Sequence, residues 1–262
     1  MSGAPRTALP GAGVRPDEGR PTAVVCCTDL GRLDYAATWR LQRALVGARK
    51  AGLDRDRLLL VEHPAVVTLG RRAREDHVLA GTETLAARGV AVHRVERGGD
   101  VTVHGPGQLV AYPILDLRLY RCDVRWYAES LLEVVVRTAA RMGVTAQARR
   151  GRETGVWVAD GRGGEAKLAQ LGVRVERWVT YHGVALNVDE CLACFDWIVP
   201  CGLHGVSVTS LARELGRPVT LDEVRPAFVA AFGAVFGVRV DALGASELRA
   251  LSARHPLGEG AP

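Results

Sequence analysis

Glycine dominates the stretch from Arg97 to Tyr112, and this stretch constrains the fold more than any other part of the chain. The runs on either side, 90–95 and 108–115, are rich in β-branched and apolar residues, which predicts two β-strands joined as a hairpin. Glycines between strands allow backbone N–H groups to approach a ligand that a Cβ would exclude. Polar side chains that can converge on such a ligand are Arg97, Thr102, His104 and Gln108. The alternative is a glycine-rich β-turn with incidental polar residues.

The same stretch carries a long motif, Arg-Gly-Gly-x-x-Thr-x-His-Gly-Pro-Gly-Gln-x-x-x-Tyr, which resembles the signature of the lipoyl-protein octanoyltransferases. Enzymes of this bacterial family move an octanoyl group from acyl carrier protein onto a lysine of lipoyl domains. Other stretches resemble motifs of the same family in the same order. They are Glu62-His63-Pro64, the Lys-x-Ala-x-Leu-Gly strand at 167–172, the Thr-x-His-Gly-x-Ala-Leu-Asn strand at 180–187 and the loop at 198–211.

The order of the predicted elements indicates an α/β protein of the α+β type, with a mixed β-sheet packed by helices. Strands are predicted at 22–27, 58–61, 65–69, 90–95, 108–115, 156–159, 166–175, 179–188 and 238–240, and helices at 34–49, 82–88, 123–142, 221–236 and 245–254. The resemblance implies the biotin/lipoate ligase-like fold. We expect one catalytic domain over 22–254, a disordered leader over 1–21 and a flexible tail over 255–262.

Lysine is nearly absent from the chain: Lys50 and Lys167 are the only lysines among 34 basic residues. Because this composition uses arginine wherever a fixed positive charge suffices, a lysine can mark a place that needs an ammonium able to lose its proton. Lys50 ends a predicted helix, where a cation is ordinary. Lys167 lies inside a predicted strand and is therefore a candidate for chemistry, with chance as the alternative.

Cys201 stands between Pro200 and Gly202, a setting that suits a nucleophile beside free backbone N–H groups. A buried structural cysteine is the alternative. A thiol with a pKa of about 8.5 is mostly protonated at neutral pH, and a nearby cation favours the reactive thiolate. Lys167 is the candidate cation. The resemblance implies the same pair, with Cys201 as the acyl-thioester nucleophile and Lys167 as the residue that activates it.

The resemblance also implies a set of substrate contacts along three motifs. These are Arg97, Gly98, Gly99, Asp100, Val101, Thr102, Val103, His104, Gln170, Leu171, Gly172, Gly183, Val184 and Ala185. Two of them depart from the family pattern, since Val103 replaces an aromatic residue and Gln170 replaces a small one. The preferred length of the acyl chain therefore stays open.

The partners implied by the resemblance are octanoyl-acyl carrier protein, the lipoyl domains of 2-oxoacid dehydrogenase complexes and the glycine cleavage H protein. No cofactor and no metal are expected, because a thioester arrives already activated. The net charge of +5 comes from arginines scattered among acids, without a basic run interleaved with aromatic residues, so an acidic protein partner suits the charge as well as nucleic acid does. The predicted partners do not include nucleic acid. No apolar run reaches the ~18 residues that span a membrane. Six cysteines without a signal peptide favour the cytoplasm.

Two alternatives come from other classes of protein. An ATP-dependent lipoate or biotin ligase has a similar Arg-Gly-Gly-rich strand, but it activates a free acid with ATP and needs no cysteine at position 201. A zinc-binding module is suggested by the spacing of Cys191, Cys194, Cys201 and His204. Zinc bound to Cys201 would remove the nucleophile. The apolar residues between the two halves of this set argue against a tight metal loop.

The zinc alternative is tested by metal content. We expect elemental analysis of the purified protein to find well under one zinc per chain, and the double variant Cys191→Ser, Cys194→Ser to keep its transferase activity. Stoichiometric zinc that disappears in the double variant would show that these cysteines bind metal and would overturn the catalytic assignment of Cys201.

Overall fold

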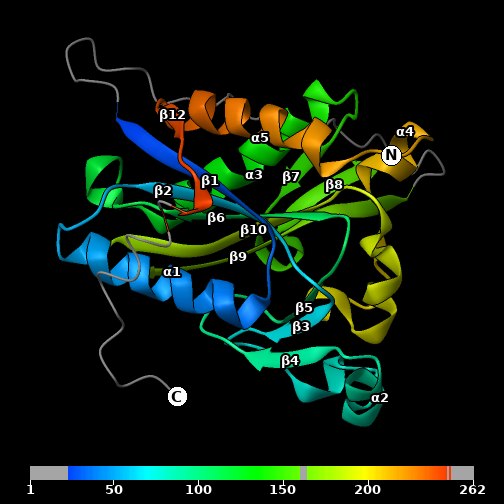
Figure 1. The fold of residues 1–262 in the computed structure, drawn as a ribbon. Helices are drawn as coiled ribbons and strands as arrows, with labels where there is room; N and C mark the ends of the chain where they lie inside the picture. The colour runs from blue at the N-terminus through cyan, green and yellow to red at the C-terminus, as the bar shows by residue number, and fades with distance from the viewer. Residues whose placement is uncertain (1–22, 160–163, 247, 249–262) are drawn as a thin grey trace, which may run out of the picture.

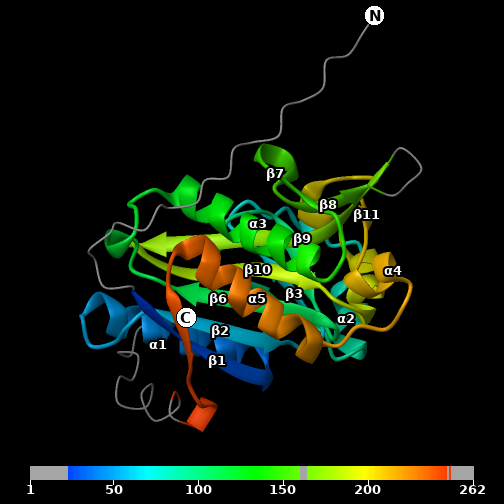
Figure 2. The same cartoon turned by 90° about the horizontal axis from the view of Figure 1, so that it is seen from above.

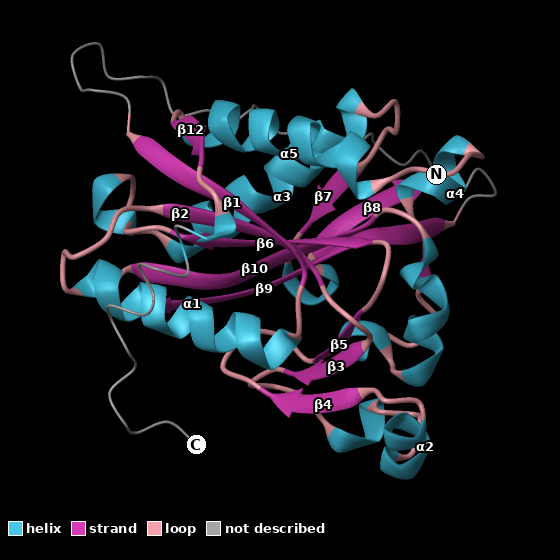
Figure 3. Ribbon diagram, in the orientation of Figure 1, coloured by secondary structure: helices cyan, strands magenta, loops and turns pink. Residues whose placement is uncertain are grey.

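The computed structural model in Figure 1 describes residues 23–159, 164–246 and 248. The expected leader and the expected tail lie outside these residues, as does most of the helix predicted at 245–254. Figure 3 shows a twisted central sheet between helices, with a small second sheet beside it. None of the described helices is both long and apolar enough to cross a bilayer.

Within the described residues the central sheet has nine strands, and it is mixed, as predicted. Its order is β12-β1-β2-β6-β10-β9-β8-β7, with β11 beside β9. The pairs β1–β12, β1–β2 and β9–β11 are parallel, and the others are antiparallel. The strands are β1 (Val24–Arg32), β2 (Arg57–Glu62), β6 (Gln108–Ile114), β7 (Gln147–Arg149), β8 (Gly155–Ala159), β9 (Glu165–Glu176), β10 (Val179–Asn187), β11 (Ser207–Val208) and β12 (Arg239–Ala242).

Helices cover both faces of this sheet, which is why β6 and β10 are buried at every residue and lack a polar face. Figure 2 shows α3 (Val124–Arg141) and α5 (Leu221–Phe236) lying side by side over one face. On the other face lies α1 (Tyr35–Lys50). The predicted helix starts are confirmed, since Asp34 and Asp123 cap α1 and α3 and Thr220 forms a capping box with Glu223.

The glycine-rich stretch does not form the predicted hairpin. It contains a strand of its own, β5 (Val101–His104), which pairs with β3 (Val66–Leu69) in a second sheet of order β4-β3-β5. Strand β4 (Ala91–Arg94) belongs to this small sheet, whereas β6 belongs to the central one. The reason is burial: Val101 and Val103 pack into a separate apolar core between β3 and the segment 194–198. The hairpin prediction treated these valines as part of a turn.

Short helical elements fill the remaining connections. They are α2 (Thr82–Ala87), α4 (Leu211–Leu215) and the 3-10 turns η1 (Glu75–His77), η2 (Leu117–Leu119), η3 (Gly151–Glu153), η4 (Glu190–Trp197) and η5 (Pro200–Gly202). No strand or helix is predicted over 195–210, where the structure has the end of η4, η5 and the two-residue β11. Strand β7 and helix α4 were not predicted.

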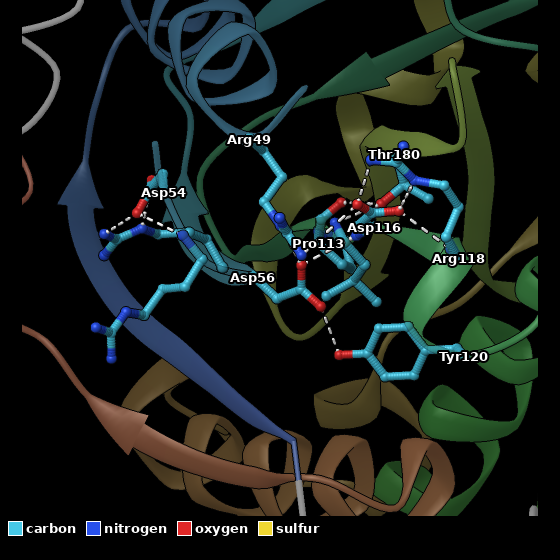
Figure 4. Close-up of polar contacts among 11 residues, drawn as sticks. Arg49, Asp54, Asp56, Pro113, Asp116, Arg118, Tyr120 and Thr180 are labelled. Carbon is cyan, nitrogen blue, oxygen red and sulfur yellow. Dashed lines mark hydrogen bonds and ion pairs between the residues drawn. The ribbon is translucent and has the colours of Figure 1, made fainter. Parts of the chain in front are cut away.

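A polar network joins the end of α1 to the start of β2 and to the segment that follows β6 (Figure 4). Asp56 lies at its centre. The carboxylate accepts hydrogen bonds from Arg49 Nε at 2.7 Å, the Tyr120 hydroxyl at 2.7 Å and the backbone N–H of Asp116 at 3.0 Å. Asp116 in turn pairs with Arg118, whose hydrogen bonds hold the pKa of that carboxyl below its ordinary value. These buried carboxylates are stabilised because each is paired.

Strand β10 approaches β6 closely at Gly183. A Cβ at this position would overlap the carbonyl oxygen of Ala111 and lie 3.1 Å from Pro113 Cδ. Glycine is therefore required by backbone packing in the middle of the sheet.

We expect Gly183→Ala to lower the free energy of unfolding by about 1–3 kcal/mol, as overpacking in a core does. For a domain of this size, each kcal/mol lowers Tm by about 2–4 °C, which differential scanning calorimetry resolves. The matched control is Gly47→Ala in α1, where a Cβ meets nothing within 4 Å. This control should gain about 0.5–1 kcal/mol, because alanine favours a helix over glycine. Equal stability of the two variants would show that the contact with Ala111 does not restrict residue 183.

Candidate active site

The two residues expected to carry the chemistry lie in direct contact. Lys167 Nζ is 3.3 Å from Cys201 Sγ. Lys167 stands in β9, and Cys201 stands in η5. After η5 the chain returns as β11, which pairs with β9 in parallel so that Val208 lies opposite Lys167. This pairing explains how a loop residue comes to lie against a side chain in the middle of the sheet.

Lys167 is completely buried. Its ammonium lies 5.3 Å from the centroid of the Trp157 ring, and no carboxylate of the described residues lies within ion-pair distance of it. A Cβ at Gly155 would come 2.5 Å from Lys167 Cε, so glycine at that position leaves the room that the lysine occupies. A buried ammonium without a carboxylate partner is costly, and the polar atom that it contacts is the sulfur of Cys201.

Cys201 is held in an unusual backbone conformation. Its φ is +55°, in the left-handed region that costs about 1–2 kcal/mol for a residue with a side chain. The turn closes through the backbone N–H of Gly202, which donates to the carbonyl of Val199 at 3.0 Å. That N–H is therefore occupied in this turn and is not free to hold an oxyanion. Strain of this kind is found where the surrounding structure fixes a functional residue.

A cavity opens beside Cys201 and gathers most of the predicted substrate contacts. Its lining is Tyr35, Arg97, Gly99, Asp100, Thr102, His104, Val110, Tyr112, Gln170, Leu171, Gly172, His182, Gly183, Val184, Ala185 and Cys201. Three predicted residues are not among them. Gly98 lines a neighbouring cavity, and Val101 and Val103 point into the core of the small sheet because side chains alternate along β5.

His104 lines this first cavity, and His63 supports its wall through Tyr112. His63 Nδ1 donates to the Leu33 carbonyl at 2.7 Å, which leaves Nε2 to accept from the Tyr112 hydroxyl at 2.9 Å. His104 Nδ1 lies 2.6 Å from Gln108 Oε1. Burial lowers the pKa of His63 to about 4 and that of His104 to about 3. Both histidines are therefore neutral at physiological pH and add no charge to this side of the cavity.

Arg97 is the fixed charge of the first cavity. Its guanidinium is buried and donates to the carbonyl of Thr68 at 2.6 Å, to the Thr68 hydroxyl at 2.9 and 3.1 Å and to the carbonyl of Gly98 at 3.1 Å. Burial lowers the pKa of Arg97 from its ordinary value. These bonds fix the loop that precedes β5 against β3.

Sequence reasoning missed four residues of this lining: Tyr35, Val110, Tyr112 and His182. The sequence did carry a signal for His182, which stands next to Gly183 in the motif at 180–187. In the structure His182 has a left-handed φ of +54°. Tyr112 closes the first motif. Tyr35, at the start of α1, stacks on His104 at 5.8 Å between ring centroids. Its position in the site follows from helix packing, which no local pattern reveals.

A second cavity adjoins the first and shares Gly99, Asp100, Leu171, Gly172 and Cys201 with it. Three arginines line this cavity: Arg72, Arg74 and Arg152. Cys201 thus lies where two cavities meet, and the second of them is lined by three arginines. Such an arrangement can hold a chain on one side and admit a charged partner on the other.

The zinc alternative is not supported by the described residues, among which no group of three histidine, cysteine or acidic side chains lies close enough to bind a metal. The side chain of Cys191 lies outside that description. Cys194 packs against the core of the small sheet, and Cys201 faces Lys167.

Comparison with known proteins identifies the family. Residues 34–233 match the family model of the lipoyl protein ligase A/B catalytic domain. An octanoyltransferase of Chloroflexus aurantiacus is 50% identical over 217 residues, which cover 82% of this chain and 96% of that protein. The chain belongs to the octanoyltransferase family. The prediction from the motifs is confirmed, and the protein is an acyltransferase that transfers octanoyl groups.

The solved structures that resemble this octanoyltransferase are lipoate ligases. A putative lipoate protein ligase from Thermoplasma acidophilum with bound lipoic acid has a TM-score of 0.69 and 15% identity, covering 87% of this chain and 93% of that one. A lipoate-protein ligase A bound with ATP has a TM-score of 0.67 and 15% identity, covering 89% and 94%. At this identity the likeness shows the fold, and it confirms the predicted ligase-like architecture.

The lysine at the site is tested by a substitution that keeps its charge. We expect Lys167→Arg to fold but to lose at least about 100-fold in turnover, because a guanidinium cannot give and take a proton as an ammonium does. Steady-state transfer measured with a thermal melt of the same sample checks this. Lys50→Arg is the matched control, since Lys50 lies in an ion pair with Glu176 away from the cavity. Near-normal turnover of Lys167→Arg would show that the reaction needs a positive charge at position 167 and no proton transfer by this residue.

Proposed function

We propose that this enzyme transfers an octanoyl group from octanoyl-acyl carrier protein to a lysine of lipoyl domains through a thioester on Cys201. This would be the first step in making the lipoate cofactor within the cell. The single observation that carries the proposal is the 3.3 Å contact between Lys167 and Cys201 where the two cavities meet.

In the first half-reaction, the Cys201 thiolate attacks the carbonyl carbon of the donor thioester. The new C–S bond forms as the bond to the carrier sulfur breaks. The carrier leaves as a thiolate and takes a proton from the Lys167 ammonium. Cys201 is now acylated, and Lys167 is a neutral amine beside it. Exchange of one thioester for another is nearly isoenergetic, so this step needs no other energy source.

The first cavity is the proposed site of the octanoyl chain. Val110, Leu171, Val184 and Ala185 supply apolar surface next to Cys201, and the neutral His104 adds no charge to that side of the cavity. Burial of each methylene stabilises such a complex by about 0.8 kcal/mol. The predicted substrate contacts are consistent with this placement.

In the second half-reaction, a lysine of the lipoyl domain attacks the acyl-cysteine and forms an amide. The C–S bond breaks, and the Cys201 thiolate returns beside the Lys167 ammonium. Conversion of a thioester to an amide is downhill, so ATP is not required. The proposed acceptors are the lipoyl domains of 2-oxoacid dehydrogenase complexes and the glycine cleavage H protein, in the cytoplasm. The arginine-lined cavity supports an acidic carrier as the donor.

The thioester is tested by incubating the enzyme with octanoyl-acyl carrier protein and no acceptor. Intact-mass analysis should show one added octanoyl group, peptide mapping should place it on Cys201, and neutral hydroxylamine should release it. Addition of a lipoyl domain should then discharge the enzyme without ATP. A ligase would show no acylated cysteine and would depend on ATP with free octanoate. Undiminished transfer by Cys201→Ser would mean that no thioester at this position lies on the pathway.

A further inference from the structure

Amide formation from the acyl-enzyme releases more protons than Lys167 can accept. An incoming lysine carries an ammonium, and roughly one in 2,500 such groups is a free amine at pH 7 for a pKa of about 10.4. Its nitrogen must lose one proton before it attacks and a second one as the amide forms. After the first half-reaction Lys167 is neutral and has room for one of these protons. The proposed mechanism therefore needs a second proton acceptor, placed where the acceptor lysine enters.

One pair of side chains near Cys201 has this chemistry and has no part in the steps described so far. His77 Nδ1 lies 2.8 Å from Asp100 Oδ2. Because a carboxylate only accepts hydrogen bonds, Nδ1 carries the hydrogen and Nε2 is left with a lone pair when the ring is neutral. The other carboxylate oxygen of Asp100 accepts the backbone N–H groups of Val101 at 2.8 Å and Arg74 at 3.2 Å. Asp100 is thus held in place from its own loop and from the segment before η1.

The imidazole of His77 lies directly against the turn that carries the nucleophile. A Cβ at Gly202 would lie 2.9 Å from His77 Cε1 and 3.2 Å from Nδ1. The carbonyl of His77 accepts the N–H of Val199 at 2.8 Å, which ties η1 to the chain just before Cys201. Only 12% of the His77 side chain and 15% of that of Asp100 are exposed. What remains exposed faces the second cavity, which both residues line with Cys201.

We propose that His77, oriented by Asp100, accepts the proton that the incoming lysine loses before it attacks the octanoyl thioester. This inference rests on the proposed thioester mechanism. His77 Nε2 takes the first proton from the ammonium and passes it to water in the open second cavity. The amine then forms the C–N bond, Cys201 leaves as a thiolate, and Lys167 takes the second proton as the amide forms. Each of the two protons has an acceptor, and the resting thiolate–ammonium pair is restored.

The charged and titratable groups that face His77 come from several elements. Asp100 faces it from the loop before β5. His204, from the turn after η5, meets it edge to face at 6.0 Å between centroids. Arg72, Arg74 and Arg152 line the same cavity, and Asp76 neighbours His77 in η1.

The test separates the two half-reactions in single-turnover experiments. His77→Asn places an amide N–H near the position of Nδ1, so that the bond to Asp100 can persist, and it removes Nε2. We expect octanoylation of Cys201 by octanoyl-acyl carrier protein to stay within about 3-fold of the unsubstituted enzyme, and discharge to a lipoyl domain to slow at least about 100-fold. Hydroxylamine is unprotonated at neutral pH and needs no base, so it should discharge both enzymes equally fast.

Two further variants define the roles. Asp100→Asn should also slow discharge, because an amide facing Nδ1 turns the ring to the tautomer whose Nε2 carries the hydrogen. His204→Asn is the matched control, an exposed histidine of the neighbouring turn, and should discharge normally. In the unsubstituted enzyme the discharge rate should fall as acid protonates an imidazole, and His77→Asn should lack that inflection.

Several outcomes would overturn the assignment. Equal slowing of both half-reactions, or slow discharge by hydroxylamine, would give His77 a structural role only. Normal discharge by His77→Asn, or a loss that falls on His204→Asn instead, would place the base elsewhere. Failure of the unsubstituted enzyme to form any acyl-cysteine would overturn the thioester proposal and this inference with it. Octanoylation without an acceptor measures that outcome separately from the discharge step.

Discussion

The contact between a buried ammonium and a thiol is the interaction on which this active site depends. Lys167 is fully buried, and within the described parts of the chain its ammonium has Cys201 Sγ as its hydrogen-bond partner. A buried charge without an anionic partner is costly. In the proposed mechanism, acylation of Cys201 would remove that partner, so the contact links the environment of the lysine to the state of the sulfur.

The two sheets meet where this contact lies, and each supplies one side of the site. The central sheet provides Lys167 on β9 and the close glycine pair Gly172 and Gly183 on β9 and β10. The small sheet provides the loop from Arg97 to Asp100, and the N–H of Gly98 donates to the carbonyl of Val173 at 2.9 Å to join the two. The strained turn at Cys201 is held against η1 by the hydrogen bond from the Val199 N–H to the His77 carbonyl. A rigid scaffold of this kind suits chemistry that needs sub-ångström placement.

Much of the fold was readable from local signals, and the site was readable in part. Helices α3 and α5 begin where they were predicted, next to the capping residues Asp123 and Thr220, and the apolar runs predicted the central strands. The second sheet was missed, since a four-residue strand between glycines has the local pattern of a turn. The motif residues do converge on Cys201, but Tyr35 and His77 were invisible in the sequence. Both reach the site through long-range packing, which has no periodic signature.

The scarcity of lysine limits the number of side-chain amines that the enzyme could acylate on itself. A protein that carries an activated acyl group offers it to any free amine within reach, including its own. In this chain one lysine is enclosed behind the sulfur, and the other is held by Glu176 at 2.6 Å. Arginine supplies the remaining positive charge, and its guanidinium keeps its proton and is not a nucleophile at neutral pH. The chain can thus be basic while carrying few side-chain amines that the proposed acyl-enzyme could acylate.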